Sequence, residues 1–188
     1  MQLLVEVLGA HGPVEARTDL SLGQIEELAS RIGYRGKHKP FGFYSSTFNY
    51  AIGVDLPETA DGACERIVRV RVDMALTKRR IEIGREIGED HCLFSTVLEH
   101  YRRHAAFDDN ALNRFVQWAT MTFNSAAMPP LQDDARSVEN DRERVREFAK
   151  KIVEQGQPTF DAERNSAAET VDTPAEIQKL AEGCSTHA

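Results

Sequence analysis

The chain has 188 residues, of which 41% are hydrophobic, so it is long enough to bury the core of one globular domain of ordinary size. Its net charge of −7 excludes a nucleic-acid binder that works through overall charge. It contains no run of about eighteen apolar residues, so the sequence predicts no membrane-spanning helix.

The N-terminal part of the chain predicts strands and one helix. Residues 3–8 are typical of a strand, and residues 14–17 are its expected hairpin partner. A helix is expected to begin after Ser21, a residue type that favours the N-cap position. Residues 41–44 and 49–54 predict two more strands, and their many aromatic side chains are more typical of a core than of a ligand site.

The clearest strand covers residues 67–76, where apolar and charged side chains alternate, so that one face is buried and one exposed. Residues 81–87 alternate in the same way. The short stretch at Thr77 and Lys78 predicts a turn, so we expect the two strands to form an antiparallel hairpin. Asp90 is expected to cap the helix that follows.

That helix, expected over residues 92–107, carries two histidines on an apolar stripe. The stripe residues follow one another at spacings of four, three, four and three: Leu93, Val97, His100, His104 and Phe107. A histidine pair at positions i and i+4 on an inward face is the geometry that holds Zn²⁺ in HExxH metallopeptidases. Here a tyrosine, Tyr101, stands where that motif has its glutamate.

A simpler explanation of the histidine pair needs no metal. Two histidines at this spacing often occur by chance, and a half-buried histidine usually packs and forms hydrogen bonds. The apolar stripe favours a ligand pair, since metal ligands must face the fold and not the solvent.

The rest of the chain predicts helices. A helix over 111–126 is expected to be capped by the polar residues 108–110. A long, highly charged helix is expected from residue 133, and residues 155–158, with a glycine and a proline, are expected to end it.

Two short helices are expected over 159–171 and 174–183, the second capped by Thr173. Strands followed by helices predict an α+β fold, with a small, mostly antiparallel sheet packed on the HxxxH helix and a helical C-terminal part. We expect one domain over residues 1–126 and a helical extension over 127–188.

The three cysteines, Cys64, Cys92 and Cys184, leave at least one thiol free or paired between chains. Their spacing matches no zinc-ribbon pattern. A glycine-rich phosphate loop, a nucleophile elbow and a CxxC pair are also missing, so phosphoryl transfer, serine hydrolysis and thioredoxin chemistry have no support.

The stretch from Ile81 to His104, IEIGREIGEDHCLFSTVLEHYRRH, resembles a group of uncharacterised, mostly exported bacterial proteins of the zincin-like, zinc-dependent peptidase type with an HExxH motif. Their pattern is a strand, an acidic or proline-containing turn, a cysteine and the HExxH helix. Residues 171–176 and Cys184 resemble their C-terminal end. The resemblance covers roughly residues 60–110 and, loosely, both ends of the chain.

This resemblance implies a zincin-like fold in which His100 and His104 bind zinc. It also implies a disulfide between Cys64 and Cys92, a periplasmic or secreted location, and a protein or peptide as partner. The missing signal peptide, taken literally, predicts a cytoplasmic protein with three reduced cysteines.

The sequence departs from the family pattern at Tyr101, which puts hydrolysis in doubt more than metal binding. Losing a general base typically lowers a rate about 10²- to 10⁴-fold. Three carboxylates are weak candidates for a third ligand. Asp108 is one further i+4 step along the stripe, and Glu139 and Glu143 lie on a later helix, where many zincins have a glutamate ligand.

Three hypotheses follow. The first is a degenerate zincin-like protein that binds metal and has lost peptidase activity or keeps a weak one. The second is a non-enzymatic structural or protein-binding module in which His100, Tyr101 and His104 form a polar core cluster. The third is an active peptidase with Tyr101 as an unusual base, although a phenol with a pKa near 10 is a poor base at neutral pH.

Overall fold

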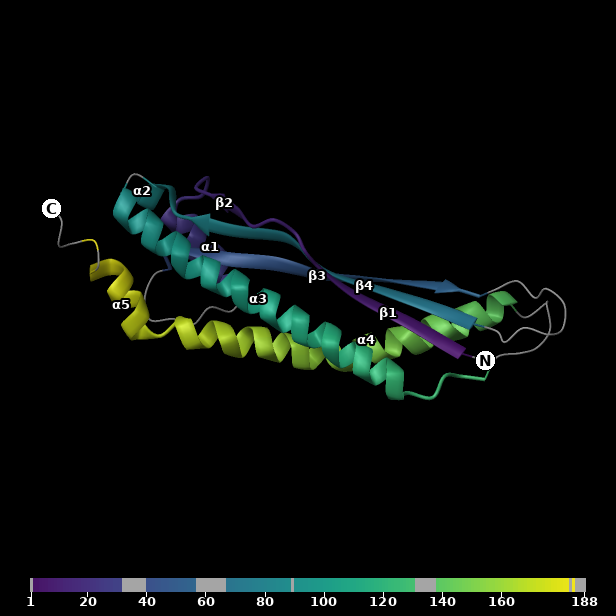
Figure 1. Ribbon diagram of the computed structural model, residues 1–188. Helices are drawn as coiled ribbons and strands as arrows, with labels where there is room; N and C mark the ends of the chain where they lie inside the picture. Colours follow the sequence, from purple (N-terminus) through teal and green to yellow (C-terminus); the bar gives the residue numbers. More distant parts are fainter. Residues whose placement is uncertain are drawn as a thin grey trace. The chain divides into compact units, whose positions relative to one another are not determined.

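The computed structural model describes residues 2–31, 40–56, 67–88, 90–130, 138–182 and 184 (Figure 1). Cys64 lies outside these residues. The strands are β1 (Gln2–His11), β2 (Glu15–Arg17), β3 (Gly42–Asp55) and β4 (Ile67–Ile83), and the helices are α1 (Leu22–Arg31), α2 (Arg85–Gly88), α3 (His91–Ser125), α4 (Val138–Val171) and α5 (Pro174–Glu182). The predicted α+β class is confirmed.

β4 is the strand to which β1, β2 and β3 all pair, and the sheet is mostly parallel. The expected antiparallel arrangement is therefore wrong. Residues 14–17 were expected to form a hairpin with the first strand. Instead, β2 pairs in parallel with β4, with Ala16 opposite Ile81.

The turn expected at Thr77 and Lys78 is an irregularity inside one continuous strand. The buried apolar positions on β4 are even-numbered up to Leu76 and odd-numbered at Ile81 and Ile83. Lys78, between them, has a left-handed backbone with φ of 49°. An extra residue of this kind, as in a β-bulge, shifts the buried face by one position without reversing the chain. Two alternating runs therefore form one strand and not a hairpin.

The chain divides into two compact units. The first contains residues 1–10, 48–75 and 111–162, and the second contains residues 11–47, 76–110 and 163–188. The division falls inside β1, β3, β4, α3 and α4. The expected domains, 1–126 and 127–188, stay a prediction.

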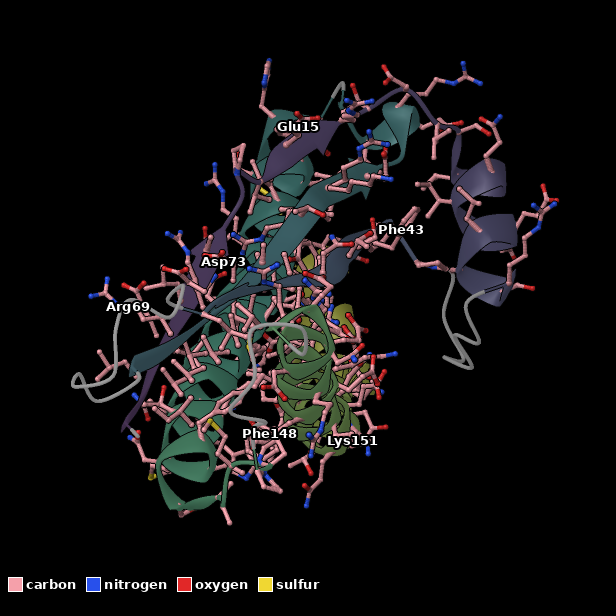
Figure 2. All side chains as sticks on the ribbon, turned by 90° about the vertical axis from the view of Figure 1, so that its right-hand side faces the viewer. Glu15, Phe43, Arg69, Asp73, Phe148 and Lys151 are labelled. Carbon is pink, nitrogen blue, oxygen red and sulfur yellow. A yellow bond between two sulfur atoms is a disulfide. The ribbon has the colours of Figure 1, made fainter. Side chains whose placement is uncertain are left out.

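The first unit has an apolar core between β4 and the helices α3 and α4. Arg69 and Asp73 lie on the face of β4 away from these helices (Figure 2). Phe48 is 5.7 Å from Phe115 and 4.9 Å from Phe160, measured between ring centroids. The buried apolar side chains of this unit include Val68, Val70, Val72, Met74, Leu112, Phe115, Ala119, Phe123, Val145, Ala149, Val153 and Phe160.

The second unit is built around the start of α3. Its core cluster is Ile81, Ile83, Ile87 and Val97, against which Leu22, Phe41, Tyr44, Leu93 and Tyr101 pack. Predicted helix caps are present here: Leu93 N donates to Asp90 Oδ1 over 3.0 Å, Gln24 N to Ser21 Oγ over 3.3 Å, and Glu176 N to Thr173 Oγ1 over 3.2 Å.

α3 is one continuous helix where two were expected. The acidic residues predicted to cap a second helix have side-chain partners instead. Arg164 Nε donates to Asp108 Oδ1 over 2.8 Å, and Arg79 forms an ion pair with Asp109. These carboxylates pair with arginines, and the helix continues through them. No helix in the described part of the chain is long and apolar enough to cross a membrane.

Candidate metal centre

His100 and His104 lie one turn apart on α3 and face into the second unit. Their exposed fractions are 2% and 8%. The i, i+4 spacing brings their Nε2 atoms to 3.3 Å from each other. The predicted inward-facing histidine pair is therefore present.

Asp172 is the third member of the cluster. It lies in the two-residue link between α4 and α5. Its Oδ1 atom is 3.1 Å from His100 Nε2 and 3.1 Å from His104 Nε2. These three side chains are a group that can hold a metal ion.

The three carboxylates predicted as weak third-ligand candidates have other partners in the described chain. Asp108 accepts hydrogen bonds from Arg164 and Ser46. Glu139 and Glu143 belong to the first unit and pair with Arg142 and Arg146, one turn further along α4.

Sequence reasoning missed Asp172 because 68 residues separate it from His104. A local signal was nevertheless present. Asp172 comes directly before Thr173, the predicted cap of α5, within the segment 171–176 that the family resemblance covers. A carboxylate held at a helix boundary in a matched segment was a candidate ligand.

The spacing of the three donor atoms is compatible with a tetrahedral metal ion, for which zinc gives the reference distances. Zinc binds imidazole nitrogen and carboxylate oxygen at about 2.0–2.2 Å, so two ligand atoms of a regular tetrahedron lie about 3.3 Å apart. The three separations here are 3.1, 3.1 and 3.3 Å. Three protein ligands with one open position are also the usual set in catalytic zinc sites.

The charges around the cluster favour an ionised carboxylate. Partial burial opposes ionisation of Asp172, but hydrogen bonds from His100 and His104 outweigh it and hold the pKa of its carboxyl well below the usual value. Arg103 Nη2 donates to Glu176 Oε1 over 2.7 Å, which lowers the pKa of that carboxyl. The same nitrogen is 3.4 Å from His100 Nδ1.

Tyr101 lies beside both imidazoles. Its ring centroid is 4.9 Å from that of His100 and 5.6 Å from that of His104. Its hydroxyl donates a hydrogen bond of 2.5 Å to the carbonyl oxygen of Gly42. A Cβ atom at Gly42 would come within 2.3 Å of the Glu82 carbonyl oxygen and 3.0 Å of the Tyr101 ring, so the close approach requires glycine there.

A cavity of about 250 Å³ opens beside the cluster. Its walls are mainly apolar or aromatic, and its polar groups come from the cluster, Tyr44, Tyr101 and Asn165. The lining residues are Ala29, Pro40, Phe41, Gly42, Phe43, Tyr44, Val97, His100, Tyr101, His104, Asn165, Ala168, Asp172 and Leu180. Asp172 is the one carboxylate among these lining residues. Phe43 is labelled in Figure 2.

A disulfide joins Cys92, near the start of α3, to Cys184, after the end of α5, with the Cα atoms 5.7 Å apart. The predicted pairing of Cys92 with Cys64 is wrong in this structure, because a cysteine sulfur forms one disulfide. Cys184 is the partner of Cys92 instead.

No protein-family model, no curated protein and no solved structure matches this chain. The zincin resemblance therefore stays a prediction.

Proposed function

We propose that this chain is a degenerate zincin-like, metallopeptidase-related protein that binds zinc and whose peptidase activity is lost or weak. The observation that carries the proposal is the convergence of His100 Nε2, His104 Nε2 and Asp172 Oδ1 within 3.3 Å of one another. When bound at such a site, zinc polarises carbonyl groups and activates water.

The donor types support zinc over the other common divalent ions. Mg²⁺ and Ca²⁺ prefer oxygen ligands, whereas imidazole suits zinc and other transition metals. The tetrahedral spacing of the three atoms favours zinc further. The mainly apolar cavity beside the cluster gives a ligand access to the open position.

Loss of hydrolysis is proposed because, among the described residues that line the cavity, we find no side chain free to act as a general base. The Tyr101 hydroxyl donates a hydrogen bond to the Gly42 carbonyl oxygen. Asp172, the one carboxylate among the lining residues, belongs to the ligand set. A zinc site without a general base can still bind the metal, but its hydrolysis rate typically falls about 10²- to 10⁴-fold.

One contact favours a second candidate, a metal-free structural or protein-binding module. Arg103 can only donate, so its approach to His100 Nδ1 favours the tautomer with the proton on Nε2. That proton then points at Asp172, and zinc binding through Nε2 requires the opposite tautomer. In this alternative, Asp172 and the two histidines satisfy one another as a polar cluster.

The deciding experiment is the zinc content of the purified full-length protein, measured by elemental analysis after dialysis against buffer with micromolar zinc. We expect about one zinc per chain in the wild type, as three protein ligands and one open position predict. His100→Ala, His104→Ala and Asp172→Ala are each expected to lose it, because each removes one of only three ligands.

His91→Ala is the matched control, since His91 is an exposed histidine at the start of the same helix and outside the cluster. It should keep the wild-type zinc content. A wild-type protein that contains no zinc, or an Asp172→Ala variant that keeps all of it, would contradict the proposal. A wild-type protein without zinc would favour the metal-free structural or protein-binding module.

A further inference from the structure

We infer that the Cys92–Cys184 disulfide is a redox control on the proposed zinc site, because it holds α5, and with it Asp172, against the helix that carries both histidines. This inference rests on the proposed function and adds its regulation. Its evidence is the way in which the chain connects the disulfide to the third ligand.

The disulfide and the metal cluster join the same two segments at both ends of α5. Asp172 lies two residues before α5 begins at Pro174, and Cys184 lies two residues after it ends at Glu182. On the other side, Cys92 and His100 are eight residues apart on α3, about 12 Å along the helix. α5 is thus attached to α3 at both of its ends, by the metal cluster before it and by the disulfide after it.

α5 also has non-covalent contacts with the rest of the second unit. Leu180 is buried, with 7% exposure. The ion pair between Arg103 and Glu176 is partly exposed, at 40% and 27%, and pairs of this kind typically contribute about 0–1 kcal/mol. A helix of nine residues is marginal by itself. The covalent link therefore adds a restraint on the C-terminal side of Asp172 that these contacts do not supply.

On its N-terminal side, Asp172 follows Val171, which is buried, and its backbone N donates to Ala168 O over 3.1 Å. Reduction is therefore expected to weaken the site and not to abolish it. Removing an outer support of a metal ligand typically costs about 10- to 100-fold in metal affinity. Since one side of Asp172 stays fixed, we expect about a tenfold loss.

The test compares zinc affinity in the full-length Cys64→Ser protein, which cannot exchange disulfides through Cys64, before and after reduction. Tris(2-carboxyethyl)phosphine converts the disulfide to two thiols and becomes its phosphine oxide, with the oxygen and the two protons coming from water. The triple variant Cys64→Ser/Cys92→Ser/Cys184→Ser is measured beside it, because it has no thiol that could bind zinc itself.

We expect about tenfold weaker zinc binding in the reduced protein and in the triple variant, and recovery when the reduced protein is reoxidised. A second readout needs no metal. Trypsin should cut after the exposed Lys179 faster in both disulfide-free forms, because α5 opens more often. Gly156→Ala, in the first unit and far along the chain from α5, controls for general destabilisation and should keep the oxidised affinity.

Equal zinc affinities in the oxidised and disulfide-free forms would overturn the inference and leave the proposed zinc site intact. Free thiols at Cys92 and Cys184 in air-oxidised protein would also overturn it. An oxidised protein that binds no zinc would overturn both the inference and the proposed function.

Discussion

Tyr101, which stands where an HExxH motif would have its glutamate, completes local packing. Its ring packs against the core cluster of the second unit and lies beside both imidazoles. Its hydroxyl has an acceptor in the Gly42 carbonyl, on a strand that passes too close for any side chain at that position. The Tyr101 hydroxyl thus already has a partner in Gly42 and does not act as a base at the cluster.

Replacing the tyrosine with glutamate separates a decayed zinc enzyme from an ordinary core. Without zinc, Tyr101→Glu places a carboxylate in a partly buried apolar site, and we expect a loss of about 2–4 kcal/mol in the free energy of unfolding. With zinc, much of this loss should be restored, because the ion offsets the charge. The measurements are thermal melts with and without zinc and a zinc-dependent peptidase assay on an unstructured peptide, in which weak activity is expected.

Tyr101→Phe is the matched variant. It removes one hydrogen bond, so we expect a loss of about 1 kcal/mol and an unchanged zinc affinity. If zinc fails to restore Tyr101→Glu while Tyr101→Phe behaves as described, the cluster is a structural feature and not a metal site.

At the scale of elements, α4 shows how a glycine and a proline can occur inside a helix. Residues 155–158 were predicted to end it, yet α4 runs on to Val171 with Pro158 inside. A Cβ atom at Gly156 would lie 2.2 Å from the Trp118 ring and 2.5 Å from the Phe115 ring. Glycine is required there for the close approach of two helices in the first unit, and it does not stop the helix.

Gly156→Ala is therefore expected to destabilise the protein, although alanine is the better helix former. The substitution gains up to about 1 kcal/mol in helix propensity. Forcing a methyl group into a filled site typically costs about 1–3 kcal/mol, and the approach here is close enough for the upper end. We expect a net loss of about 1–2 kcal/mol, measured by urea unfolding.

Gly23→Ala is the comparison. Gly23 is near the start of α1, and a Cβ atom there would have its nearest neighbour at 3.9 Å. It should be neutral or stabilise by up to about 1 kcal/mol. A stabilised Gly156→Ala protein would show that the two helices do not approach as closely as described.

The elements show which features a sequence pattern encodes. Caps at Ser21, Asp90 and Thr173 were predicted because each needs only a neighbouring backbone N–H group. The predicted hairpin was wrong because Lys78 adopts a left-handed conformation inside a continuous strand. The predicted helix break at 108–110 was wrong because Asp109 and Asp108 pair with arginines 30 and 56 residues away in the sequence. Asp172 was missed for the same reason, since its partnership with the histidines depends on how the C-terminal helices fold back.

For the whole molecule, five elements belong to both compact units: β1, β3, β4, α3 and α4. Melting one unit therefore requires parts of these elements to lose structure inside a continuous strand or helix. Because secondary structure forms cooperatively, we expect the protein to unfold in a single transition despite its two units.

Zinc tests this cooperativity, since all three proposed ligands belong to the second unit. At a zinc concentration 100 times the Kd, binding adds about 2.7 kcal/mol to the native state. For a chain of this size, that raises Tm by roughly 5–10 °C. In a calorimetric scan we expect a single peak whose Tm rises when zinc is bound. Gly156→Ala, a substitution in the first unit, should show the same rise in Tm. Removing the zinc with a chelator should return Tm to its zinc-free value. Two peaks, of which zinc moves only one, would show that the units unfold independently and that the shared elements do not couple them.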